Sequence, residues 1–133
     1  MFLAELGGRV ICIDKDLSRL PDDKSLSVSL TKLRLDLFTD PWPFGTATIG
    51  GIVLVDFLHL PLFSHFENCL VPGGLFLLET VSGRGKNYRE LPRMGELLAE
   101  VGKSFHVEFY KESIVGPRPL RRVSVKMLAR RRA

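Results

Sequence analysis

The chain has 133 residues and a mass of 15.0 kDa, which is the size of one small domain and excludes two independent hydrophobic cores. With 45% hydrophobic and 26% charged residues, it contains too much apolar material for an intrinsically disordered protein. We therefore expect a single folded domain over residues 1–133.

The net charge of +4 is concentrated at one end. Residues 1–102 contain 10 Lys and Arg against 13 Asp and Glu, whereas residues 103–133 contain 9 against 2. A nucleic-acid site is one interpretation of this basic region. We prefer a solvated strand face followed by a frayed terminus, because no aromatic residue interleaves residues 118–132 for base stacking.

Targeting and membrane segments are not predicted. Residues 1–8 lack the basic region of a signal peptide, and the longest apolar run, residues 49–58, is about half of the ~20 residues that a membrane span needs. Cys12 and Cys69 have neither the number nor the spacing of a disulfide framework or a zinc site. We expect both to be buried, reduced thiols in a cytoplasmic protein.

The first half of the chain contains three predicted strands. Residues 9–14 form a short apolar run, residues 32–37 alternate with period two, and residues 51–56 are a continuous β-branched run of the kind buried on both faces by a parallel sheet. Residues 15–31 are polar and carry at most one helical turn. Residues 40–44 contain two prolines and fit neither a helix interior nor a central strand.

The second half alternates helices and strands. An amphipathic helix is predicted over residues 60–70, a strand over 75–81 and a helix over 94–101, and the last two strands, 105–111 and 122–129, form an antiparallel pair. This order predicts an α/β sandwich whose sheet is mostly parallel with one reversed edge strand. Ligands bind such sheets beyond the carboxyl ends of the strands, where Asp14, Asp36, Asp56 and Glu79 would lie.

Four segments resemble the later motifs of class I S-adenosylmethionine-dependent methyltransferases. They are residues 8–14, residues 35–37 followed by 41–44, residues 52–59 and residues 70–80, in the family's order. The similarity is greatest to the small bacterial, tellurite-resistance-type branch, in which a segment like residues 87–98 also follows the fifth strand. The resemblance implies a Rossmann-like three-layer sandwich with an antiparallel C-terminal hairpin.

The resemblance also implies the cofactor and its contacts. Asp14 matches the acid that holds the ribose hydroxyls of S-adenosylmethionine, and Asp36 and Leu37 match the pair that reads adenine through a carboxylate and a backbone amide. Asp56 and Phe57 match positions that open toward the methyl group. On residue chemistry alone, a helix-cap or turn acid is an equally good interpretation of Asp14 and Asp36.

The chain contains two histidines, His59 and His65, near the predicted strand end at Asp56. His59 and His65 lie six residues apart with a proline between them, which is not the spacing of a helical metal pair, and no metal site is predicted. We expect His65 to be a surface helix residue. His59 follows the strand that ends at Asp56, and imidazole can accept a proton near neutral pH, so Asp56 and His59 are the catalytic candidates.

One departure from the family concerns the start of the domain. The family's first strand and its Gly-rich turn, which cradles the methionine part of the cofactor, have no counterpart here, so the domain is N-terminally truncated relative to the family. In the family's strand order, 3-2-1-4-5-7-6, that strand is central. We expect cofactor binding to be weakened or lost. We also expect the sheet to close up or to leave two unpaired edges, which would favour a homodimer.

The sequence is therefore consistent with two functions. The first is methyl transfer from S-adenosylmethionine to a small-molecule acceptor, with the acceptor pocket formed by loops at Trp42 and residues 84–93. Trp42 and Phe44 could form a wall of such a pocket, but we prefer to interpret them as a cover over a sheet edge. The second function is a non-catalytic α/β scaffold that binds nucleic acid or an acidic partner through the basic C-terminal region.

Overall fold

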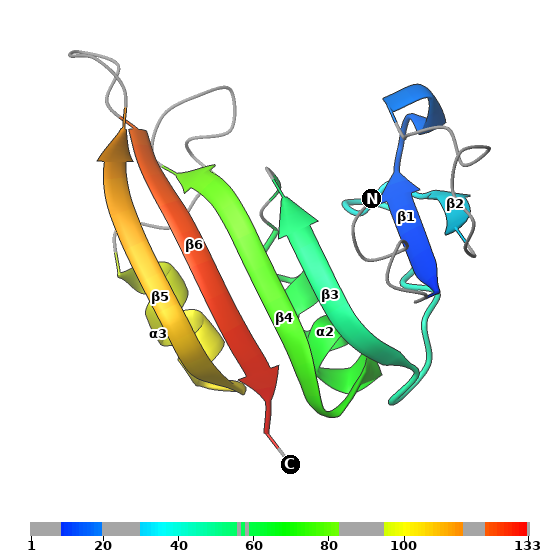
Figure 1. Ribbon diagram of the computed structural model, residues 1–133. Helices are drawn as coiled ribbons and strands as arrows, with labels where there is room; N and C mark the ends of the chain where they lie inside the picture. The colour runs from blue at the N-terminus through cyan, green and yellow to red at the C-terminus, as the bar shows by residue number, and fades with distance from the viewer. Residues whose placement is uncertain are drawn as a thin grey trace. The chain divides into compact units, whose positions relative to one another are not determined.

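The computed structural model describes residues 9–19, 30–55, 57, 59–82, 95–115 and 122–132. Two compact units, Met1–Trp42 and Pro43–Ala133, divide the chain (Figure 1). Asp56 and the predicted acceptor loop 84–93 lie outside the described residues. Within the described ranges, no helix has both the length and the apolar character needed to cross a membrane.

The first unit contains two parallel strands, β1 (Val10–Asp14) and β2 (Leu30–Arg34), paired from Val10 with Leu30 to Asp14 with Arg34. A 3-10 turn, η1 (Leu17–Arg19), follows β1, and residues 20–29 of the polar segment lie outside the described residues. β2 begins two residues before and ends three residues before the predicted strand. It ends early because the backbone of Asp36 turns to accept hydrogen bonds from the Thr39 and Asp40 amides.

The second unit contains a four-stranded sheet in the order β3-β4-β6-β5. Its strands are β3 (Ile49–Val55), β4 (Leu70–Ser82), β5 (Phe105–Val115) and β6 (Arg122–Arg131). β3 and β4 are parallel, and β6 is antiparallel to both of its neighbours, so the predicted C-terminal hairpin is confirmed. The reversed strand was expected at the edge. It lies one strand inward, because β6 returns between β4 and β5 and pairs with both.

The start of β4 departs from a regular strand at residues 71–74. Ile49 pairs with Leu70, but the next pair is Gly51 with Leu75, so the chain of β4 loops out between them. Gly73 has a φ of +77°, which favours glycine. A Cβ at Gly74 would lie 2.8 Å from the Val71 carbonyl oxygen. Gly73 and Gly74 therefore allow the irregular backbone at the start of β4.

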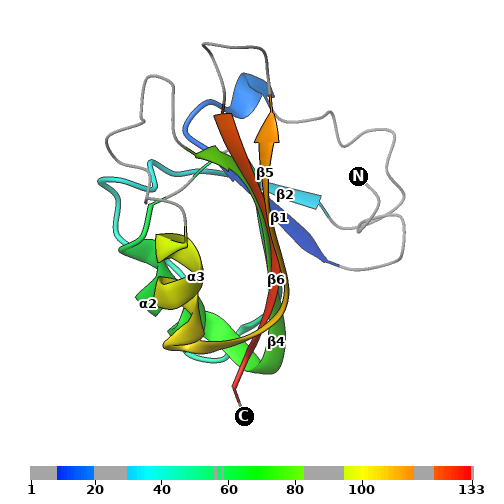
Figure 2. The ribbon, with the colours of Figure 1, turned by 90° about the vertical axis from the view of Figure 1, so that its left-hand side faces the viewer.

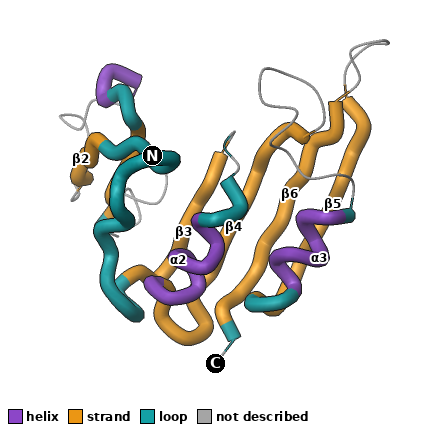
Figure 3. Tube along the Cα trace, turned by 180° about the vertical axis from the view of Figure 1, so that it is seen from behind, coloured by secondary structure: helices purple, strands orange, loops and turns teal. Residues whose placement is uncertain are grey.

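Helices α2 (Leu62–Cys69) and α3 (Glu96–Gly102) cover one face of this sheet (Figures 2 and 3). The aromatic core lies between them and the sheet: the ring of Phe76 on β4 is 5.4 Å from Phe63, 5.2 Å from Phe66 and 5.7 Å from Phe105. The buried residues of α2 follow the amphipathic pattern that predicted the helix. They are Leu62, Phe63, Phe66 and Cys69.

The opposite face of the sheet is exposed, so the prediction that residues 51–56 are buried on both faces is wrong. Val53 and Val55 on β3 are 50% and 57% exposed, whereas Leu54 between them is buried. Successive side chains of a strand point to opposite faces. The described helices therefore cover Leu54 and leave its neighbours open.

Among the described strands, β1 and β3 belong to two separately hydrogen-bonded sheets, and each is an edge strand of its own sheet. Cys69 is buried as predicted, but Cys12 on β1 is only half-buried, and neither cysteine forms a disulfide. Burial raises the pKa of the Cys12 thiol, partly offset by Lys32. Residues 41–45 form neither helix nor strand, as their prolines predict, and Trp42 and Phe44 are half-buried.

Candidate functional site

The carboxyl edge of β1 and β2 brings the predicted cofactor acids onto neighbouring strands. Asp14 is the last residue of β1, and the Leu35 amide extends the parallel ladder by donating to the Asp14 carbonyl oxygen at 3.2 Å. Asp36 is the next residue. β2 ends at Arg34, so Asp36 and Leu37 lie in the turn that directly follows it. Asp14, Asp36 and Leu37 thus lie at the carboxyl ends of two neighbouring parallel strands.

Asp36 is held in a tight turn by its neighbours. Its Oδ1 accepts the Phe38 amide at 2.9 Å, and its own amide donates to Oδ2 of Asp40 at 2.8 Å. The Asp40 amide in turn donates to the Asp36 carbonyl oxygen at 2.8 Å. This reciprocal arrangement resembles a helix capping box. One carboxylate oxygen of Asp36, Oδ1, therefore has the role of a turn acid. The other oxygen, Oδ2, has no part in these turn contacts.

Asp14 has the same kind of local role. Its Oδ1 accepts the Asp16 amide at 3.0 Å, and Oδ1 of Asp16 accepts both the amide and the hydroxyl of Ser18, at 3.0 and 2.6 Å. Two successive carboxylates thus organise the segment after β1. A shallow cleft of about 550 Å³ lies here and is lined by Lys15, Asp16, Leu17, Ser18 and Arg34. It adjoins Asp14 in sequence, although neither Asp14 nor Asp36 lines it.

The local hydrogen bonds leave hydrogen-bonding capacity at this edge. Within residues 9–19 and 30–42, Oδ2 of Asp14, Oδ2 of Asp36 and the amide of Leu37 make no hydrogen bond. An ionised carboxylate offers about four acceptor positions, so each acid can accept further donors while keeping its turn. The edge therefore presents two negatively charged acceptors and one backbone donor, the set needed for a ligand with a diol, an amine and a ring nitrogen.

The catalytic candidates belong to the second unit. Phe57 and His59 follow β3 and are half-buried, while Asp56 between β3 and Phe57 lies outside the described residues. The His59 carbonyl oxygen accepts the Leu62 amide at 3.1 Å, so its backbone helps to start α2. His65 is exposed on α2, as predicted. No cluster of three metal-binding side chains is present in the described part of the chain.

A polar pair on β5 was missed by the sequence analysis. The Tyr110 hydroxyl donates to Oε1 of Glu112, and the same oxygen accepts the Gly95 amide at 2.9 Å. Burial and the Glu112 carboxylate raise the pKa of Tyr110 above its usual range. Tyr110 and Glu112 are two residues apart and so share one face of β5. This two-residue spacing is the sequence feature that could have indicated the pair. The pair fixes the residue that precedes α3.

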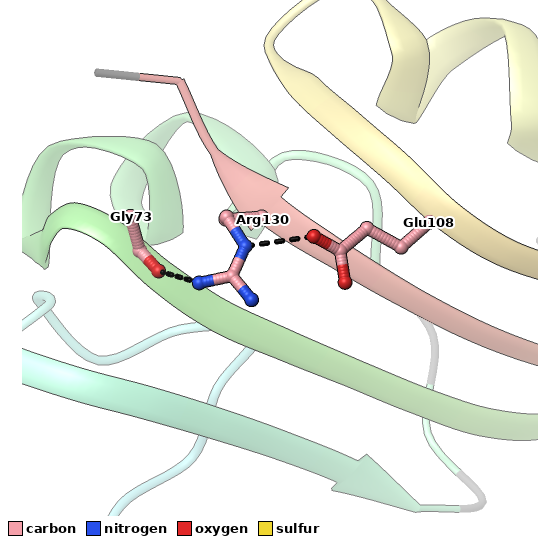
Figure 4. Close-up of polar contacts among 3 residues, drawn as sticks. All are labelled: Gly73, Glu108 and Arg130. Atoms are coloured by element: carbon pink, nitrogen blue, oxygen red, sulfur yellow. Dashed lines mark hydrogen bonds and ion pairs between the residues drawn. The ribbon is translucent and has the colours of Figure 1, made fainter.

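The expected frayed C-terminus is wrong for the described residues, because three successive arginines are tied to backbone carbonyls. Arg130 donates to the Gly73 oxygen at 2.9 Å and to Oε1 of Glu108 at 2.8 Å (Figure 4). Arg131 donates to Leu70, and Arg132 to Gly102 at 3.0 Å. Hydrogen bonding to Arg130 lowers the pKa of Glu108. These contacts are structural, and they give no support to a nucleic-acid site at this end.

Comparison with known proteins identifies the fold. No protein-family model and no curated protein matches this sequence. Among solved structures, a SAM-dependent methyltransferase from Methanosarcina mazei aligns with a TM-score of 0.70 and 14% identity over 98% of this chain and 85% of that chain. The N-methyltransferase NodS from Bradyrhizobium japonicum, in complex with S-adenosyl-L-homocysteine, aligns with a TM-score of 0.64 and 13% identity, over 92% and 66%.

The same fold also occurs in a protein described by another reaction. A [4+2]-cyclase aligns with a TM-score of 0.72 and 11% identity over 94% of this chain and 66% of that chain. At these identities the comparisons establish the fold and not the reaction. The strand order fits, because β2-β1 and β3-β4-β6-β5 correspond to positions 3-2 and 4-5-7-6 of the expected order.

Proposed function

We propose that this chain, which has the α/β fold of class I S-adenosylmethionine-dependent methyltransferases, binds the adenosine part of S-adenosylmethionine and transfers its methyl group to a small-molecule acceptor. The observation that supports the proposal is the edge formed by Asp14, the last residue of β1, together with Asp36 and Leu37 in the turn that follows the neighbouring parallel strand β2. This is the edge at which open α/β sheets bind ligands.

Each residue of the edge suits one part of adenosine. The Asp14 carboxylate accepts hydrogen bonds from the ribose diol, Oδ2 of Asp36 accepts from the exocyclic amine, and the Leu37 amide donates to a ring nitrogen. The turn around Asp36 supports this assignment, because the Phe38 amide holds Oδ1 at 2.9 Å and thereby orients the carboxylate before a ligand arrives.

The chemistry needs positioning more than acid–base catalysis. S-adenosylmethionine supplies a methyl group that is already activated by the sulfonium centre. We assign Asp56, Phe57 and His59 to the side of the acceptor, because they follow the carboxyl end of β3. In this proposal, His59 accepts a proton from the acceptor nucleophile, and Phe57 excludes water.

The two carboxylates of this edge are expected to contribute directly to the free energy of cofactor binding. A hydrogen bond to a charged group contributes about 1.5–3 kcal/mol, so loss of either carboxylate should weaken binding about 10-fold or more.

Calorimetric titration of the full chain with S-adenosylhomocysteine tests the proposal. We expect saturable binding that Asp14→Asn and Asp36→Asn each weaken about 10-fold or more. Glu100→Gln is the matched control, because Glu100 is an exposed acid of the second unit whose partner is Lys103 at 3.0 Å. Absence of binding, or equal affinity in all three variants, would refute the proposal.

A further inference from the structure

The exposed face of the second unit's sheet carries an apolar row that crosses all four strands. The pairing registers place Val53 of β3 beside Leu77 of β4, Leu77 beside Leu128 of β6, and Leu128 beside Phe109 of β5. Val53, Leu77 and Phe109 are 50%, 43% and 51% exposed, and Leu128 is half-buried. Single exposed apolar residues are ordinary, but a contiguous row marks an interaction surface.

Charged residues border this row on both sides. Toward the carboxyl ends of β3 and β4, the neighbouring row is Val55, Glu79, Lys126 and Lys111. All four are exposed, and within the described residues Glu79 and Lys126 form no ion pair. On the other side, Leu75 lies beside Arg130, whose guanidinium is held between Glu108 and Gly73 (Figure 4).

We propose that this face binds a second copy of the chain, sheet against sheet, about a two-fold axis that runs parallel to the strands. Such an axis reverses the strand order of the second copy relative to the first. Each residue keeps its position along the direction of the strands. It places Leu77 opposite Leu128 of the second copy, and Val53 opposite Phe109, so that each large ring meets a small side chain. Face-to-face sheets pack about 10 Å apart with their strands nearly aligned.

The charge pattern selects this axis over the alternative. Along the strands, the axis sets Glu79 opposite Lys126 of the second copy, and the symmetry repeats the pair, giving two complementary contacts. A two-fold axis across the strands would instead set Lys126 opposite Arg130 and Glu79 opposite Leu75. Like charges placed together at an interface are strongly unfavourable. An arrangement that matches both the apolar row and the Glu79 and Lys126 charges to themselves favours a two-fold homodimer over an unrelated partner.

The proposed interface differs from dimerisation through the unpaired edge of β3. An edge contact adds a strand through backbone hydrogen bonds and depends little on side chains of the sheet face. The face contact buries Leu77 at its centre. Substitution of Leu77 therefore distinguishes the two arrangements, since it leaves the edge of β3 intact.

Sedimentation equilibrium of the full chain tests the proposal. We expect a mass of twice 15.0 kDa for the wild type and of one chain for Leu77→Glu. Leu98→Glu is the matched control, because Leu98 on α3 is 39% exposed and lies off this face. A wild-type mass of one chain overturns the proposal. A dimer that persists in Leu77→Glu also overturns it.

Exchange of the charges at Glu79 and Lys126 provides a second test, which changes neither the buried core nor the apolar row. Glu79→Lys and Lys126→Glu should each raise the dissociation constant of the dimer about tenfold or more, because each sets like charges opposite one another. The double variant restores opposite charges and should return the dissociation constant to near the wild-type value. Equal effects of the single and double variants would contradict the proposed axis.

Discussion

The carboxylate of Asp40 accepts the Asp36 amide at 2.8 Å, and the Asp40 amide donates back to the Asp36 carbonyl oxygen at 2.8 Å. This exchange closes the turn after β2, which contains the backbone of Leu37. The proposed adenine contacts are thus built by a residue that would not touch adenine. Asp40 is a positioning residue whose loss should be measurable in both stability and affinity.

We expect Asp40→Ala to lower the free energy of unfolding by about 1 kcal/mol, as the loss of a helix cap does. It should also weaken binding of S-adenosylhomocysteine, because the Asp36 carboxylate and the Leu37 amide lose their fixed orientation. Asp40→Asn keeps a side-chain acceptor and should recover most of both losses. Chemical denaturation and calorimetry measure the two effects, and an affinity that is unchanged in Asp40→Ala would contradict the positioning role.

The pair of Glu108 and Arg130 predicts a stability difference that depends on pH. Arg130 lowers the pKa of Glu108 below its usual value of 4.5, so the pair stabilises the folded state above pH 4.5. That contribution is lost as the pH falls from 4.5 through the lowered pKa. Denaturation of wild type and Glu108→Gln should therefore differ slightly at pH 7 and converge at low pH. A difference that grows on acidification would contradict the assignment.

Tyr110 predicts the opposite behaviour at alkaline pH. Burial and Glu112 raise its pKa above the usual 10, so the neutral phenol stabilises the folded state below pH 10. This contribution is lost as the pH rises through the raised pKa. We expect Tyr110→Phe to remain more resistant than the wild type to alkaline unfolding. Ultraviolet titration of Glu112→Gln should show Tyr110 ionising at a lower pH, and an unchanged titration would contradict the contribution of Glu112.

Gly74 predicts a steric penalty. A Cβ at this position lies 2.8 Å from the Val71 carbonyl oxygen and 3.1 Å from the Gly50 carbonyl oxygen, both of which are backbone atoms. Gly74→Ala should lower the free energy of unfolding by about 1–3 kcal/mol. Gly102→Ala is the control, because its added Cβ meets nothing within 4 Å in α3. Thermal denaturation of both variants checks the prediction, and equal midpoints would contradict it.

Several features of the site could be predicted from the sequence because they depend on neighbours in the chain. The apolar run around Ile13 and the alternation around Leu33 predict strands, and the position of Asp14 at the end of its strand predicts the ligand edge. The boundaries of β2 could not be predicted. They depend on the hydrogen bonds between Asp36 and Asp40, and short strands with ambiguous ends are decided by such competing turns.

The basic C-terminal region was misjudged for a related reason. Its composition indicates charge, but the partners of a guanidinium are chosen by the fold. Arg130 and Arg131 reach Gly73 and Leu70, residues about 60 positions earlier, because β6 lies beside β4. A separation of that size along the chain leaves no local pattern from which the contacts could be read.

By itself, the sequence determined the α/β class, the order of the elements and the position of Asp14 at the end of its strand, because side-chain periodicity and turn residues act over short distances along the chain. Only the tertiary structure decided what each strand faces. It covered Leu54 and Phe76 with helices, left Val53 and Leu77 open, and aligned an apolar row across four strands. Cross-strand register joins residues distant in sequence, so it is set by packing of the whole sheet and not by any segment of it.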